Sequence, residues 1–180
     1  LDLLEIAKKR NDQEMIFKAL HNVGWVKTLA GEPQQALAYL EKAREMAPSS
    51  IETLACYFGA ATYANAENPA KLEELLSSLE AEIKKHPDSA DLYLAKAALL
   101  AEFRRYPQAI KAFKRAARFD PRRVGIYINL SEFHLQLNHK IRAHYYNYKA
   151  LKLDQGMGLL TYIMFQLRRR LEDKLEKPIS

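Results

Sequence analysis

Cysteine is almost absent from this 180-residue sequence, in which Cys56 is the only one. A single cysteine cannot form an intrachain disulfide, and no cluster of cysteines is present to hold a metal ion. Since a helical periplasmic protein needs no disulfides, the cytoplasm and the periplasm both stay open as compartments. Cys56 has no histidine near it in sequence, so we interpret it as a buried thiol and not as a nucleophile.

Glycine and proline are scarce as well, with 6 and 7 residues, which leaves room for long helices. The longest apolar-leaning run, around residues 157–167, is too short to span a bilayer and ends in three arginines, so no transmembrane helix is expected.

Zinc-protease, nucleophile-elbow, P-loop and dinucleotide motifs are all missing. His134, His139 and His144 follow one another at intervals of five residues, and residues at this spacing do not lie on one face of a helix. We therefore predict no enzymatic activity, no catalytic residue, no cofactor and no metal.

Small residues recur at fixed spacings. Ala97 and Ala109 are twelve positions apart, Ala116 follows seven positions later, and Pro121 stands twelve positions after Ala109. Two other segments repeat these spacings: Gly24, Ala36, Ala43 and Pro48, and Ser131, Ala143, Ala150 and Gln155. Between the paired small residues of the three segments stand Leu40, Phe113 and Asn147. Pro87 and Pro121 are separated by thirty-four positions, which is the period of tetratricopeptide arrays.

This grid resembles the tetratricopeptide repeat family over about residues 17–155, with three well-matched repeats and one degenerate one. The resemblance implies an all-α, right-handed superhelical solenoid of antiparallel helix pairs. We expect one solenoid made of a truncated repeat or cap at 1–11, repeats at 12–50, 51–89, 90–123 and 124–155, and a capping helix and tail at 156–180. The distance from Pro48 to Pro87 exceeds the period by five positions, and an insertion is expected at 65–70.

Local signals predict where several helices begin and end. Asn11 or Asp12 is expected to cap the helix that follows, and Ser49 with Glu52 has the capping-box pattern, so a helix should begin near Ile51. Asn68 followed by Pro69 is a cap with proline at the first helical position. Asp88 and Ser89 are expected to cap the next helix. Tyr106-Pro107 and Asn138-His139 are expected turns.

The resemblance also implies a function. First helices of the family line a concave groove that usually receives a peptide or helix of a partner, so we expect a protein-protein interaction scaffold. The groove positions that we single out as partner contacts are Trp25, Leu29, Tyr63, Leu94, Ile128, Asn129 and Leu135. Cys56 and Thr62 fall in the wider lining. The carboxylate clamp of chaperone-tail binders is absent, because its positions hold His21, Trp25, Cys56, Asp91 and Ala95. An apolar or amphipathic segment is therefore the expected ligand.

Charge supports a second hypothesis. Residues 1–87 hold 10 Lys and Arg against 13 Asp and Glu, a net −3, whereas residues 88–180 hold 18 against 9, a net +9. One basic helix face with its extension consists of Lys111, Lys114, Arg115, Arg118, Arg122 and Arg123. This row would bind a nucleic acid or an acidic protein, or it is a solvated convex surface. Nearby aromatics would stack on bases or pack in the core: Tyr127, Tyr145, Tyr146 and Tyr148.

The two ends of the chain suggest further roles. The first residues already have the pattern of a helix, as in a fragment of something longer, so an accessory interaction domain of a larger enzyme or assembly factor is another interpretation. Near the other end, Tyr162 and Phe165 would leave apolar surface on a terminal helix at 159–174. Self-association through that helix is a further hypothesis.

Overall fold

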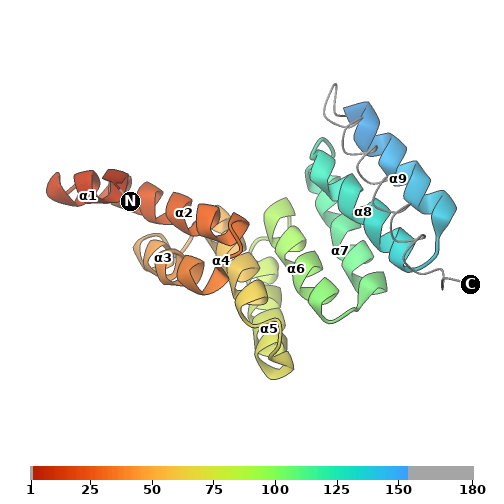
Figure 1. Cartoon of the computed structure of the whole chain (residues 1–180), viewed down its shortest axis with the longest axis horizontal. Coiled ribbons are helices and arrows are strands. Elements are labelled where there is room, and N and C mark those ends of the chain that lie inside the picture. The colour runs from red at the N-terminus through yellow and green to blue at the C-terminus, as the bar shows by residue number, and fades with distance from the viewer. Residues whose placement is uncertain (1, 154–180) are drawn as a thin grey trace, which may run out of the picture. The chain divides into compact units, whose positions relative to one another are not determined.

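Helices and short connections make up the computed structural model, which describes residues 2–153 of the chain. The described part contains nine helices and no strand (Figure 1), which confirms the all-α prediction. The helices are α1 Asp2–Lys9, α2 Gln13–Leu29, α3 Pro33–Met46, α4 Ile51–Ala64, α5 Pro69–Lys85, α6 Ala90–Glu102, α7 Tyr106–Phe119, α8 Val124–Gln136 and α9 Lys140–Leu153. The chain divides into two compact units, Leu1–Phe119 and Asp120–Ser180, and each is described by itself. The expected capping helix at 156–180, with Tyr162 and Phe165, lies outside the described residues.

Side-chain caps fix the starts of four helices. The capping oxygens accept hydrogen bonds from backbone N–H groups over 3.0–3.3 Å, and they belong to Asp12, Ser50, Asn68 and Ser89. The predicted Asn68-Pro69 start of α5 is confirmed. The predicted capping box at Ser49 and Glu52 is wrong. Ser50 has the extended backbone that a cap requires, and Glu52 reaches His21 instead, with 3.5 Å between Oε1 and Nε2.

Three tight turns within the helix pairs share one backbone feature. Gly31, Arg104 and Asn138 have φ of 75°, 55° and 57°, and each stands two residues before the second helix of its pair. A left-handed residue at this place reverses the chain within three residues. The turn expected at Tyr106-Pro107 is therefore misplaced. Both residues lie in the first turn of α7, where proline costs no helical hydrogen bond.

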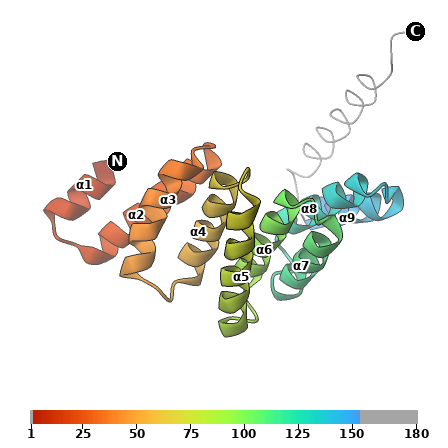
Figure 2. The ribbon, with the colours of Figure 1, turned by 90° about the horizontal axis from the view of Figure 1, so that it is seen from below.

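The regular pairs pack around the predicted small residues. Helices α2 and α3 lie side by side in the first unit (Figure 2), as do α6 and α7, and α8 packs on α9 in the second unit. The alanines of the grid are 0–3% exposed: Ala36, Ala43, Ala97, Ala109, Ala116, Ala143 and Ala150. Ser131 donates a buried hydrogen bond of 2.9 Å from Oγ to the carbonyl oxygen of Ala143. Close approach of the two backbones explains why only small residues fit there.

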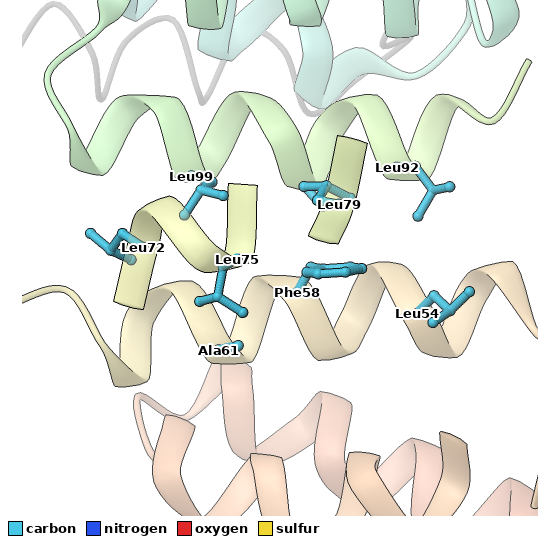
Figure 3. Packing of buried hydrophobic residues seen from close by; sticks show 9 residues of the cluster. Leu54, Phe58, Ala61, Leu72, Leu75, Leu79, Leu92 and Leu99 are labelled. Atoms are coloured by element: carbon cyan, nitrogen blue, oxygen red, sulfur yellow. The ribbon is translucent and has the colours of Figure 1, made fainter. Parts of the chain in front are cut away.

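The pair formed by α4 and α5 departs from this plan. Helix α5 has 17 residues, three more than α7, and both helices end two residues before a proline. The extra length therefore lies at the start of α5, beside the insertion expected at 65–70. Leu75 has the same spacing to Pro87 that Ala109 of α7 has to Pro121. Figure 3 shows three leucines of α5 in the core between α4 and α6, namely Leu72, Leu75 and Leu79.

Helix α1 extends the core of the first unit. Leu4 and Ala7 are 6% and 0% exposed, and Leu4 packs with Ala19, Leu20 and Ala43. The amphipathic helix expected at the start of the chain is thus present. Within residues 2–153, no helix has both the length and the apolar character that crossing a membrane requires.

Candidate functional site

Large apolar side chains remain exposed on the first helices of the repeats. Trp25 and Leu29 of α2 are 50% and 68% exposed, and Tyr63 of α4 is 51% exposed. Val26, which is 55% exposed, belongs to the same end of α2 and was missed, because its repeat position is not one of the expected groove positions. We call the sides of α2 and α4 that carry these residues, together with the equivalent side of α6 that carries Ala98 and Glu102, the first-helix face.

Equivalent repeat positions line up on this face. Leu29, Tyr63 and Glu102 are the last or next-to-last residues of α2, α4 and α6. The first two are one repeat period apart, and the spacing from Tyr63 to Glu102 adds the five extra residues of the irregular repeat. Burial raises the pKa of Tyr63 above its ordinary value of 10.0, and the nearby negative charge of Glu102 raises the pKa further. The ends of α4 and α6 therefore bring a phenol close to a carboxylate.

Gly59 is the counterpart of Trp25 on α4, one repeat period further along the chain. A Cβ built on Gly59 would meet no described side chain within 4 Å, so the face is open at this point. Ala98 occupies the same position on α6 and is half-buried. The positions of α4 and α6 that are equivalent to Trp25 thus hold small residues, Gly59 and Ala98.

The other predicted groove residues have different environments. Leu94, Ile128, Asn129 and Leu135 are half-buried, and the last three belong to the second unit. The predicted position of Thr62 is wrong: its side chain is 0% exposed, and its Oγ1 donates to the carbonyl oxygen of Phe58 in the same helix over 2.7 Å.

Two positions of the chaperone-type clamp face the inside of the fold. Cys56 is half-buried and packs against a core cluster of α3 and α4, so the buried thiol that we expected is only partly enclosed. Ala95 is 6% exposed in the core shared with α5. At a third position, His21 places Nδ1 3.1 Å from Oγ1 of Thr53. These side chains are a thiol, a methyl group and an engaged imidazole, in place of the lysine, asparagine and arginine that clamp a carboxylate.

The predicted basic row borders a cleft. Lys111, Lys114, Arg115 and Arg118 are exposed on α7 and line a cleft of about 820 Å³ formed by α5, α6 and α7, which we call the basic cleft. These four side chains are exposed, as in the solvated surface that the sequence also suggested, and they border the cleft. Arg122 and Arg123 are exposed too, but they belong to the second unit.

The histidines and tyrosines of the second unit have mixed roles. His134 and His139 place their Nδ1 atoms 3.4 Å apart, because the turn at Asn138 folds one histidine back over the other. Spacing along a single helix could not reveal this contact. Tyr146 stacks on His134 with 5.4 Å between ring centroids. His144 is exposed, and no group of three potential metal ligands is found among residues 2–153.

Packing explains only part of the tyrosine cluster. Tyr127 is 1% exposed, its hydroxyl donates to the carbonyl oxygen of Pro121 over 2.8 Å, and the ammonium of Lys149 lies over its ring. Tyr145 and Tyr148 are 58% and 61% exposed. The expectation of buried or half-buried packing positions therefore holds for Tyr127 and Tyr146 and fails for Tyr145 and Tyr148.

Solved helical-repeat proteins have a similar fold, although no protein-family model matches the chain and no curated protein matches its sequence. TTC0263, a thermophilic TPR protein in Thermus thermophilus, is 18% identical, with a TM-score of 0.66 over 77% of this chain and 75% of that one. MamA 41-end from Desulfovibrio magneticus RS-1 is 19% identical, with a TM-score of 0.58 over 85% and 82%. A further MamA structure is 18% identical, with a TM-score of 0.56 over 87% and 90%. The chain therefore has the all-α helical-repeat fold of tetratricopeptide proteins.

Proposed function

We propose that the chain is a non-catalytic scaffold that binds an apolar or amphipathic segment of a protein partner on its first-helix face. The observation that carries this proposal is the exposure of Trp25, Leu29 and Tyr63, which are 50%, 68% and 51% exposed. Burying such side chains contributes roughly 25 cal/mol for each Å² of apolar surface removed from water. A partner segment that covers them gains this energy.

The residue types suit protein recognition. Tryptophan and tyrosine are enriched among the residues that dominate binding energy, because each offers a large rigid surface with one polar atom. The Tyr63 hydroxyl and the nearby Glu102 carboxylate supply polar groups at one end of the face. Gly59 leaves space on α4 in which an apolar side chain of the partner would pack. An amphipathic segment matches this combination better than a wholly polar one.

Affinity capture from the source cell tests this proposal with two kinds of variant. Trp25→Ala removes the largest apolar contact, whereas Gly59→Leu adds a side chain where the fold leaves open space. Both variants are expected to lose a protein that the unaltered chain retains. Gly125→Leu is the matched control, because a Cβ at Gly125 also meets nothing within 4 Å among the described residues, and Gly125 lies in the second unit.

Two further measurements make the result decisive. Circular dichroism and thermal unfolding should show that both first-helix-face variants remain helical and unfold cooperatively. Binding of the retained protein should change little between low and moderate salt, because apolar contacts are not screened. Capture of the same protein by the unaltered chain and both variants would refute the first-helix face as the binding site.

A further inference from the structure

The basic cleft is separate from the first-helix face. Helix α6 contributes Tyr93, Lys96 and Leu100 to the cleft, whereas Ala98 and Glu102 belong to the first-helix face. With about 100° between successive residues, these two sets point to opposite sides of α6. Binding in the cleft therefore does not rest on the function proposed above, and each surface can be altered without touching the other.

The floor of the basic cleft is apolar. It is formed by side chains from all three helices: Leu76, Ile83, Tyr93, Leu100 and Ala112. Leu100 and Ala112 are 3% and 5% exposed, so they belong to the core, while the other three are half-buried. The ring of Tyr93 stacks on Phe119, with 5.9 Å between centroids and 15° between planes, which holds the ring in place.

One wall of the basic cleft carries unbalanced positive charge. Lys111, Lys114, Arg115 and Arg118 are exposed and form no ion pair with any residue among 2–153. Two carboxylates of α5 pair with other cations of the cleft. Glu80 pairs with Lys96, and Glu73 pairs with Arg105, each over 2.5 Å. The cleft thus presents the four cationic side chains of α7, beside the ion-paired Lys96 and Arg105, around its apolar floor.

We propose that the basic cleft binds an amphipathic helix of a protein partner that carries acidic side chains along one edge. Lys111 and Arg118 are seven residues apart, about 10 Å along α7, which matches carboxylates at i and i+7, two turns apart on a bound helix. The apolar side of that helix covers the floor, and its acidic edge faces α7. The complementary charges speed association and fix the orientation of the bound helix.

The apolar floor favours a peptide over a nucleic acid. Phosphates need only the cationic wall, and they gain nothing from Leu76, Ile83 or Ala112. Among the described residues that line the cleft, Tyr93 is the single aromatic one, and one of its faces is stacked on Phe119, so at most one base could stack there. A ligand with both apolar and acidic groups uses every part of the cleft.

Fluorescence anisotropy with synthetic peptides tests the inference on the full chain. The probe is a labelled helical peptide of four turns with leucines at i, i+3, i+4 and i+7 and glutamates along one edge. One control peptide replaces the glutamates by glutamine, a second replaces the leucines by serine, and labelled oligo(U) RNA is the third probe. The first peptide should bind at least about tenfold more tightly than either control peptide and than the RNA.

Charge reversal on the chain locates the binding site. Lys114→Glu together with Arg118→Glu should weaken binding of the acidic amphipathic peptide by about tenfold or more. Lys9→Glu with Lys42→Glu makes the same change in net charge at exposed residues of α1 and α3, and should leave the affinity within about twofold. Trp25→Ala should also leave it unchanged, which separates this site from the first-helix face.

Three outcomes would overturn the inference. Equal loss of peptide binding in both charge-reversed pairs would show that only net charge attracts the peptide. Undiminished binding to the Lys114→Glu, Arg118→Glu protein would place the site elsewhere. Binding of the serine peptide or of oligo(U) as tight as that of the leucine peptide would show a polyanion surface that makes no use of the floor.

Discussion

Helix pairs α6–α7 and α4–α5 stand next to each other in the chain but pack in different ways. In the first pair, Ala97, Ala109 and Ala116 are all 0% exposed and let the two helices touch closely. In the second pair, Leu75 takes the place of the first alanine of the second helix, and Glu82 takes the place of the next one. As a result, α4 packs more extensively on α6 than on its own partner α5.

Bulky side chains replace close approach in the irregular pair. The leucines of α5 fill the space between α4 and α6 and join a cluster with Phe58 and Leu99 (Figure 3). Leu72 and Leu79 are 2% and 0% exposed, so this arrangement is as well buried as the regular one. The same helix contributes Leu76 and Ile83 to the basic cleft. Helix α5, which lacks the alanine grid, thus forms the basic cleft together with the regular pair α6–α7.

Exchanging alanine and leucine at the equivalent positions 75 and 109 should destabilise both helix pairs. Leu75→Ala makes α5 match the repeat pattern, but we expect it to lower the free energy of unfolding by about 2–5 kcal/mol, because it leaves a cavity between α4 and α6. Ala109→Leu should lower it by about 1–3 kcal/mol, because the added side chain has no space where α6 and α7 touch. Chemical denaturation monitored by circular dichroism measures both changes.

A control for this exchange lies on α5. Ala81→Leu adds the same atoms at an exposed position of α5 and should change the free energy of unfolding by no more than about 0.5 kcal/mol. An increase in stability of the Leu75→Ala protein would show that α5 prefers the regular packing, and the comparison between the two pairs would then fail.

Alanine substitutions at two glycines, each adding one methyl group, compare a close helix contact with an open helix surface. A Cβ on Gly24 would stand 2.5 Å from Cγ of Leu40 and 3.3 Å from the carbonyl oxygen of Ala36, so α2 and α3 have no room for it. Gly24→Ala should therefore lower the free energy of unfolding by about 1–3 kcal/mol. Gly59→Ala, in the middle of α4, should raise it by about 0.5–1 kcal/mol, because no described side chain is near and alanine favours helix. Thermal unfolding of the two proteins, with opposite shifts of Tm, checks the pair. Equal shifts would mean that the α2–α3 contact is not close.

The sequence was most informative where spacing alone determines structure. The grid of Gly24, Ala36 and Ala43 predicts the helix pairs because small residues are required wherever two backbones touch. Caps such as Asn68-Pro69 are equally local, since they involve one side chain and the next turn. The cap of α4 is Ser50 and not the predicted Ser49, so the pattern located the cap to within one residue. Which of two adjacent serines caps a helix depends on backbone angles that the pattern does not encode.

Contacts between helices were harder to predict. The cleft lined by Lys111 and Arg118 also contains side chains of α5, and no single helix pattern contains the position of α5 relative to α7. The contact between His134 and His139 likewise depends on a left-handed turn at Asn138. Thr62 was assigned to the groove by its repeat position alone, although the packing of α4 turns it inward. These errors all concern distances between elements, which the periodicity of one helix does not determine.

The smallest effect that we predict concerns the titration of Tyr63, which tests whether the ends of α4 and α6 are close in solution. Burial and, to a lesser degree, Glu102 raise the pKa of this phenol above 10.0 in the folded chain. The stability linked to Tyr63 is therefore fully present below pH 10.0 and is lost as the pH rises through the higher, folded pKa.

Glu102→Gln should move the pKa of Tyr63 back toward the ordinary value without reaching it, because burial remains. Ultraviolet difference titration against the Tyr63→Phe protein isolates this phenol among the 10 tyrosines. An unchanged titration in the Glu102→Gln protein would mean that α4 and α6 do not meet at these ends. That result would contradict the packing of α4 on α6 that distinguishes the irregular pair.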